Sequence, residues 1–267
     1  MRLILSLFGT LIALATAAPS CLAGALIEVP GANEGQSPLP AYLARPSGAG
    51  PFPAVVVLHG CGGLNNVAVT WADRLASWGY VALALDSLTP RHRTNACGSG
   101  SQEQPFDGYQ ALKFLASQPF VRAHRVAVLG MSLGGGSVLT ALERGLVEPM
   151  FPLKFRAGVA FYPWCAGTLG IMTAPTLVLI GELDDWTPAA ACRDMAAGET
   201  GAYGPPREPG DRSMVELVVY PDTHHSFVAS ELRSGVRLYG HWLEYNDAAT
   251  QDAANRVKSF FKRTLGE

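Results

Sequence analysis

The stretch RVAVLGMSLGGGSVLTALERG, residues 125–145, predicts a strand, a tight turn and a helix in direct succession. Its first part is mostly apolar and favours a buried strand, and its last part has the spacing of a helix that ends in glycine. Ser132 lies between the two, with Gly130 and Gly134 beside it. A serine at such a corner has a strained backbone and needs small neighbours, so we expect its hydroxyl to project above the sheet as a nucleophile. The alternative interpretation is a packing turn that requires small residues.

Strand and helix patterns alternate along most of the chain. After short strands at residues 25–31 and 40–46, apolar strand patterns occur at residues 53–60, 80–87, 157–163, 175–181 and 213–221. Helices are expected at residues 69–80 and 107–118, around Cys192, and at residues 246–265. Buried strands that alternate with helices pair in parallel through right-handed crossovers. The sequence therefore predicts an α/β fold with a mostly parallel central sheet, helices on both faces, and a single domain over residues 25–267.

The composition is that of a compact soluble protein with a sizeable core. The chain has 267 residues, of which 48% are hydrophobic and 16% are charged, and its formal net charge is −2. Lysine and arginine are scattered, so no basic patch indicates a nucleic-acid partner. No cluster of metal-ligand residue types stands out, and we expect neither a metal nor an organic cofactor.

The first residues have the layout of a secretory signal. A positive charge precedes an apolar stretch, which is shorter than the roughly 20 residues of a membrane span and ends in small residues. We expect a signal peptide over about residues 1–24, cleaved after Ala17 or near Ala23, and export to the periplasm or the medium. Lipidation at Cys21 is the less favoured alternative, because a lipoprotein signal usually has leucine where this chain has Ala18. No other segment is long and apolar enough to cross a bilayer.

A serine nucleophile requires a histidine base and a carboxylate that orients it. The segment YPDTHHSF follows the last predicted strand and offers His224 and His225, whereas His241 lies further along and is interpreted as a surface or packing residue. The segment LIGELDDWTP follows the strand at residues 175–181 and offers two carboxylates, Asp184 and Asp185. The order serine, aspartate, histidine, each after a different strand, is the order of α/β-hydrolases.

The segment LHGCGGL, residues 58–64, is the candidate oxyanion hole. It follows a buried strand and resembles the His-Gly-Gly-Gly loops of esterases. The backbone N–H groups of Cys61 and Leu133 would then stabilise the oxyanion. His59 precedes the serine in the chain and is interpreted as part of the scaffold.

Five segments together resemble the dienelactone hydrolase family of α/β-hydrolases: VVLHGCGGL, GYVALALDS, RVAVLGMSLGG, LVLIGELDDWTP and VVYPDTHHSF. The resemblance covers essentially the whole mature chain. It implies Ser132 as nucleophile, Asp184 as the acid that follows Gly181, and His225 as the histidine that precedes a small residue and phenylalanine. The enzymes that give the family its name use a cysteine nucleophile. The serine here favours a general esterase that acts on small-molecule esters or lactones.

The strand order that the resemblance implies also pairs the cysteines. The strands that lead to Cys61 and Cys97 should be neighbours, and the same holds for the elements that carry Cys165 and Cys192. We therefore expect Cys61–Cys97 and Cys165–Cys192 disulfides. Arg91, in a loop at the catalytic edge, is a candidate partner for a substrate carboxylate, and the alternative is a solvated loop arginine.

Other functions are compatible with this pattern. A non-catalytic small-molecule binding protein could use the same fold, because a fold does not dictate a function. An acyltransferase or a peptidase could use the same three residues with a different acceptor or leaving group.

Overall fold

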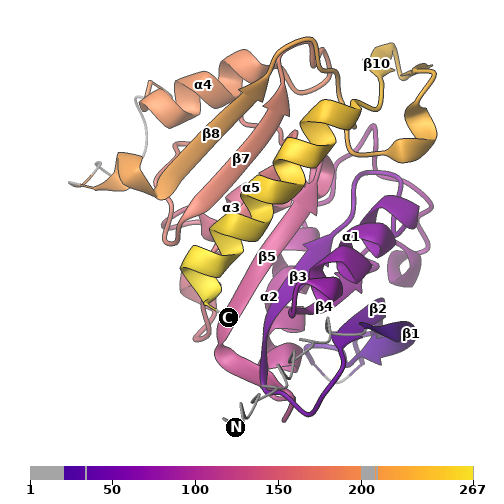
Figure 1. Cartoon of the computed structure of the whole chain (residues 1–267). Helices are drawn as coiled ribbons and strands as arrows, with labels where there is room; N and C mark the ends of the chain where they lie inside the picture. Colours follow the sequence, from indigo (N-terminus) through magenta and orange to yellow (C-terminus); the bar gives the residue numbers. More distant parts are fainter. Residues whose placement is uncertain (1–20, 34, 200–207, 209, 267) are drawn as a thin grey trace, which may run out of the picture.

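An eight-stranded sheet runs through the molecule in the order β1-β2-β4-β3-β5-β6-β7-β8 (Figure 1). The computed structural model describes residues 21–33, 35–199, 208 and 210–266, so most of the predicted signal segment lies outside the described residues. The strands are β1 (Cys21–Val29), β2 (Leu39–Pro46), β3 (Phe52–Leu58), β4 (Val81–Leu85), β5 (Val121–Met131), β6 (Gly158–Phe161), β7 (Thr176–Gly181) and β8 (Val215–Tyr220). Strand β2 is antiparallel to both of its neighbours, and the pairs from β4 to β8 are parallel. The predicted mostly parallel sheet is confirmed.

Helices cover both faces of this sheet, as predicted. They are α1 (Asn66–Ser77), α2 (Gln104–Ala116), α3 (Leu133–Leu142), α4 (Ala189–Ala197) and α5 (Asp247–Leu265). Figure 1 shows α1 and α5 in front of the sheet and α2 and α3 behind it. Helix α4 packs against β7 and β8. No helix in the described part of the chain has the length and apolar character that a bilayer span requires.

Capping side chains explain where two helices begin. Helix α1 starts three residues before the predicted start, because the side chain of Asn65 caps it. The Asn65 Oδ1 accepts the N–H of Val67 at 3.1 Å. Helix α5 starts after Asn246, whose side chain accepts the N–H of Ala249 at 3.1 Å. Its first turn carries an acidic residue and its last turn carries basic residues, which complements the helix dipole.

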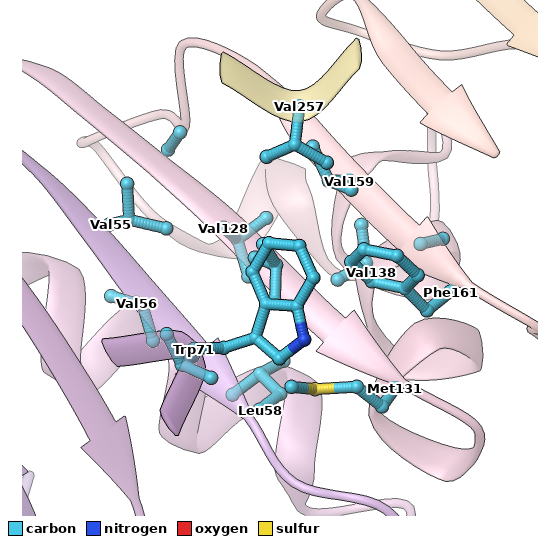
Figure 2. Packing of buried hydrophobic residues seen from close by; sticks show 14 of the residues in the cluster. Val55, Val56, Leu58, Trp71, Val128, Met131, Val138, Val159, Phe161 and Val257 are labelled. Carbon is cyan, nitrogen blue, oxygen red and sulfur yellow. The ribbon is translucent and has the colours of Figure 1, made fainter. Parts of the chain in front are cut away.

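The core lies between the sheet and the helices on each face. Strand β4 is buried at every residue, as expected for a strand covered on both sides. The Trp71 indole of α1 packs on the Phe161 ring of β6, with 4.7 Å between ring centroids. Figure 2 shows other members of this core, Val55, Val56, Leu58, Val128, Met131, Val138, Val159 and Val257. Leu58, Met131 and Phe161 are the last residues of β3, β5 and β6, so this core reaches the carboxyl ends of these strands.

Short elements that the sequence did not predict follow β8. They are the 3₁₀ turn η4 (Ser230–Leu232) and a hairpin of β9 (Val236–Leu238) and β10 (His241–Leu243). The other 3₁₀ turns are η1 (Thr89–Arg91), η2 (Glu148–Met150) and η3 (Asp211–Met214). The hairpin strands are too short, and β9 too exposed, for a periodic pattern of apolar residues to reveal them. The hairpin lies at the same edge of the sheet as the candidate site (Figure 1).

Candidate active site

Ser132 occupies the corner between β5 and α3, as predicted. Its φ of 53° and ψ of −115° lie in a region that side-chain-bearing residues rarely adopt. Backbone hydrogen bonds hold this conformation, because the Ser132 N–H donates to the Phe161 carbonyl at 2.9 Å and the Ser132 carbonyl accepts the Gly136 N–H at 2.9 Å. The strained turn therefore presents the hydroxyl at the strand end rather than inside the helix.

The glycines beside Ser132 are required by close backbone approaches. A Cβ atom on Gly130 would overlap with the carbonyl of Gly134, and one on Gly134 would overlap with the carbonyl of Leu58. Both obstacles are backbone atoms of the packed core and cannot rotate away. The small residues thus allow α3 to begin directly against β3 and β5.

We expect Gly130→Ala to lower the free energy of unfolding by about 2–3 kcal/mol, because the added methyl group forces the backbone apart. Urea unfolding monitored by circular dichroism measures this change. Gly98→Ala is the matched control, since a Cβ atom there meets nothing within 4 Å. Equal stability of the two variants would contradict the steric argument.

Three side chains from different strand ends meet at this edge. The His225 Nε2 lies 3.0 Å from the Ser132 Oγ, and the His225 Nδ1 lies 2.8 Å from the Asp184 Oδ2. The side chains of His225 and Asp184 are 1% and 0% exposed. In this geometry the Nδ1–H donates to the carboxylate, so Nε2 is free to accept the serine hydroxyl. The arrangement can transfer a proton from the serine to the imidazole.

The Asp184 carboxylate is fixed by donors from the segment that follows it. Its Oδ1 accepts the backbone N–H groups of Trp186 at 3.0 Å and Thr187 at 2.8 Å, and its Oδ2 lies 2.9 Å from the Thr187 hydroxyl. Thr187 is a functional residue that the sequence predictions above did not include. An aspartate with threonine three positions later is the signal that could have indicated it, because aspartate side chains often accept such N–H groups.

The alternative residues point elsewhere. The Asp185 Oδ1 accepts the backbone N–H of Trp242 at 3.1 Å and lies 3.5 Å from the His241 Nδ1. His224 is on the surface side of the loop, with its Nδ1 3.1 Å from the Leu183 carbonyl. The structure thus brings Asp184 and His225 to the serine and keeps Asp185, His224 and His241 away from it.

The loop after β3 lies beside the serine. Cys61 lines the same cavity as Ser132, and no hydrogen bond within the described part of the chain occupies the Cys61 N–H. Leu133 is the first residue of α3, where backbone N–H groups have no partner inside the helix. Both predicted oxyanion donors therefore lie in the loop and at the helix start that border the serine.

His59 supports this loop from beneath. It is fully buried; its Nε2 accepts the Ser87 N–H at 3.1 Å and its Nδ1–H donates to the Gly60 carbonyl at 2.6 Å. Burial lowers the pKa of His59 and favours the neutral ring that these two bonds require. The Gln104 side chain donates to the His59 carbonyl at 3.0 Å and accepts the Ser137 hydroxyl at 2.8 Å. These contacts agree with its interpretation as scaffold.

Both expected disulfides are present. Cys61 and Cys97 are bonded at the cavity wall, and Cys165 and Cys192 join the segment after β6 to α4. The Cys61 carbonyl also accepts the Ala96 N–H at 2.7 Å. The first disulfide therefore ties the loop with the candidate oxyanion donor to the segment after η1.

The structure does not bring Arg91 to the serine. Its guanidinium donates to the Asp107 carboxylate at 2.8 and 2.9 Å and to the Ser87 carbonyl at 2.7 Å. Arg91 lines a separate cavity of about 730 Å³ beside α2, whereas the cavity at the serine has about 220 Å³. The hypothesis of a carboxylate partner at the site is corrected, because Asp107 on α2 already neutralises this charge.

Aromatic side chains enclose the histidine. The Tyr162 and Trp186 rings lie 4.7 and 5.2 Å from the His225 ring. The Trp186 ring also stacks on the His241 ring, with 5.0 Å between the ring centroids. Within the described residues, no group of histidine, cysteine, aspartate and glutamate side chains could hold a metal ion.

The sheet is mostly parallel, and serine, histidine and aspartate side chains are in contact beyond its strand ends. This combination defines the α/β-hydrolase class. The particular family follows from the sequence. Residues 39–265 match the model of the dienelactone hydrolase family, and the chain belongs to this family. It is a hydrolase that acts on esters or lactones.

Two curated relatives align with most of the chain. A protein of Bradyrhizobium sp., provisionally named 2-oxo-3-(5-oxofuran-2-ylidene)propanoate lactonase, is 26% identical over 218 residues, or 73% of this chain and 81% of that protein. A protein of Azospirillum brasilense, provisionally named carboxymethylenebutenolidase, is 25% identical over 252 residues, or 90% of this chain and 99% of that protein.

Solved structures share the fold. A dienelactone hydrolase-like promiscuous phosphotriesterase from metagenomic libraries has a TM-score of 0.70 and 22% identity, over 94% of this chain and 100% of its own. The esterase Est2 of Thermogutta terrifontis has a TM-score of 0.62 and 15% identity, over 91% of this chain and 93% of its own.

Proposed function

We propose that this protein is a serine hydrolase that cleaves carboxylic esters or lactones of small molecules through an acyl-enzyme. The observation that carries the proposal is the hydrogen-bonded chain from Asp184 through His225 to the Ser132 hydroxyl, at 2.8 and 3.0 Å. Serine becomes nucleophilic when a base in hydrogen-bond contact takes its proton, and this geometry supplies that base.

The reaction proceeds in two steps. The Ser132 oxygen attacks the carbonyl carbon while the His225 Nε2 takes its proton, and the N–H groups of Cys61 and Leu133 stabilise the oxyanion. The Asp184 carboxylate stabilises the imidazolium, which then protonates the leaving alcohol. Water attacks the acyl-enzyme with His225 again as base, which releases the acid and regenerates the serine. The Tyr162 and Trp186 rings pack against the imidazole and help to fix its orientation.

A fluorophosphonate probe tests the proposal. We expect the probe to label one serine, Ser132, because covalent capture needs an activated hydroxyl rather than an exposed one. Mass spectrometry of a tryptic digest identifies the labelled peptide. The exposed Ser117 serves as the internal control, since its hydroxyl donates to the Phe114 carbonyl rather than to an imidazole. A protein that remains unlabelled would contradict the proposed acyl-enzyme on Ser132.

We infer further that the protein is exported. The layout of residues 1–24 supports this location, and disulfides such as the two found here form and persist in oxidising compartments. Strand β1 begins at Cys21, so cleavage after Ala17 would leave it whole, whereas cleavage near Ala23 would remove its first residues. The strand thus favours the earlier of the two cleavage sites.

A further inference from the structure

The cavity at Ser132 is walled mainly by uncharged side chains. It has a volume of about 220 Å³, and its apolar wall is formed by Val67, Ala68, Leu232, Val236, Leu238 and Leu243. These side chains come from α1, η4 and the β9–β10 hairpin. Such a wall binds short alkyl or small cyclic groups, because they lose contact with water when they enter.

The formal charge that side chains bring to the lining of this cavity is negative. Among the described residues that line it, Glu231 supplies a carboxylate and no lysine or arginine is present. No ion pair joins Glu231 to another described residue. Burial raises the pKa of the Tyr162 phenol, and the negative charges of Asp184 and Glu231 raise it further. The negative field of Glu231 therefore reaches the ring that packs on His225.

The arginines nearest to Glu231 in the chain are directed elsewhere. The Arg233 guanidinium lies over the Tyr245 ring, 4.4 Å from its centroid. Arg237 donates to the Gly240 carbonyl at 2.7 Å. Neither side chain lines the cavity. A substrate carboxylate would thus lose its hydration without gaining a cation, and it would do so beside a like charge.

We propose, on the basis of the proposed esterase function, that this site selects small esters without a negative charge and that Glu231 is a specificity-determining residue. Its carboxylate disfavours substrates that carry a carboxylate group and tolerates uncharged or cationic ones. Rejection by a like charge is a general way to obtain specificity, because it raises the free energy of the wrong complex.

The test compares 4-nitrophenyl esters of similar length and different charge. These are 4-nitrophenyl pentanoate, mono-4-nitrophenyl glutarate, which is anionic, and 4-nitrophenyl 4-(trimethylammonio)butyrate, which is cationic. The measured quantity is kcat/KM for each ester, after its hydrolysis without enzyme has been subtracted. We expect the wild-type protein to hydrolyse the anionic ester least efficiently.

Variants at Glu231 isolate the role of its charge. We expect Glu231→Gln to raise the ratio of kcat/KM for the anionic ester to that for the uncharged ester by roughly fivefold, and Glu231→Lys to raise it further. The changes should shrink in about 0.5 M salt, since screening weakens interactions between exposed charges. A loss of packing alone would not respond to salt or to the charge of the ester. Glu28→Gln, on the exposed edge strand β1, is the matched control and should leave the ratio unchanged.

The outcomes separate this inference from the function on which it rests. Equal efficiency toward the anionic and uncharged esters in the wild type would overturn the role of Glu231 and leave the esterase in place. A ratio that stays at its wild-type value in both Glu231 variants would do the same. Absence of hydrolysis of all these esters, together with an unlabelled Ser132, would overturn the proposed function itself.

Discussion

Ser132→Ala is expected to lower kcat/KM for 4-nitrophenyl acetate by about 10⁴-fold or more, the scale at which loss of a serine nucleophile acts in such enzymes. The variant keeps Cys61, Leu133 and His225, so it can still bind the ester and polarise its carbonyl. It has no oxygen with which to form the acyl-enzyme. Initial rates measured by nitrophenolate absorbance give the change.

The fold of this variant must be checked independently. Alanine replaces serine at a φ of 53°, where both residues are strained, so we expect thermal unfolding to change little. The matched control is Ser117→Ala, which removes a hydroxyl that donates to the Phe114 carbonyl at 2.7 Å on the surface. Turnover by a folded Ser132→Ala protein at the wild-type rate would remove the nucleophile from the mechanism.

Asp184→Asn is expected to lower kcat by about 10³–10⁴-fold, because an amide can turn its NH₂ group toward the imidazole and favour the wrong tautomer of His225. The neighbouring substitution Asp185→Asn is its control. Asp185 contacts Trp242 and His241 rather than His225, so its loss should change kcat by less than about tenfold.

Steady-state kinetics with one ester measures both variants side by side. The comparison is informative because the substitutions are chemically identical and adjacent in sequence. They differ in burial, since the side chain of Asp184 is 0% exposed and that of Asp185 is 49% exposed. A larger loss of kcat in Asp185→Asn would reassign the acid to the next residue.

The local signals in the sequence were sufficient for much of the fold. Buried strands such as β3 and β4 are continuous apolar segments in the sequence, and the glycines around Ser132 predicted a tight turn. The order of strands that the family resemblance implied also led to the two disulfides. Each of these expectations depended on residues close together in sequence or on a general rule of sheet topology.

Long-range pairing was harder to anticipate. Nothing near Arg91 in the sequence reveals that its partner is Asp107 on α2, because their contact depends on how the loop after β4 packs on that helix. The residues of the β9–β10 hairpin gave no signal either, since strands of three residues show no periodicity. Without the family resemblance, the residues alone do not distinguish His224 from His225. The side chains of adjacent loop residues point to opposite sides, and the coordinates are needed to see which one contacts Ser132.

The Cys61–Cys97 bond gives the proposed export a consequence for the loop beside Ser132. Glutathione and thioredoxin keep thiols reduced in the cytosol, so a newly made chain there would lack the covalent closure of the loop beside Ser132. That closure would come only after the chain has crossed the membrane. With the proposed export, the covalent link between the loop beside Ser132 and the segment that carries Cys97 would therefore form outside the cytosol.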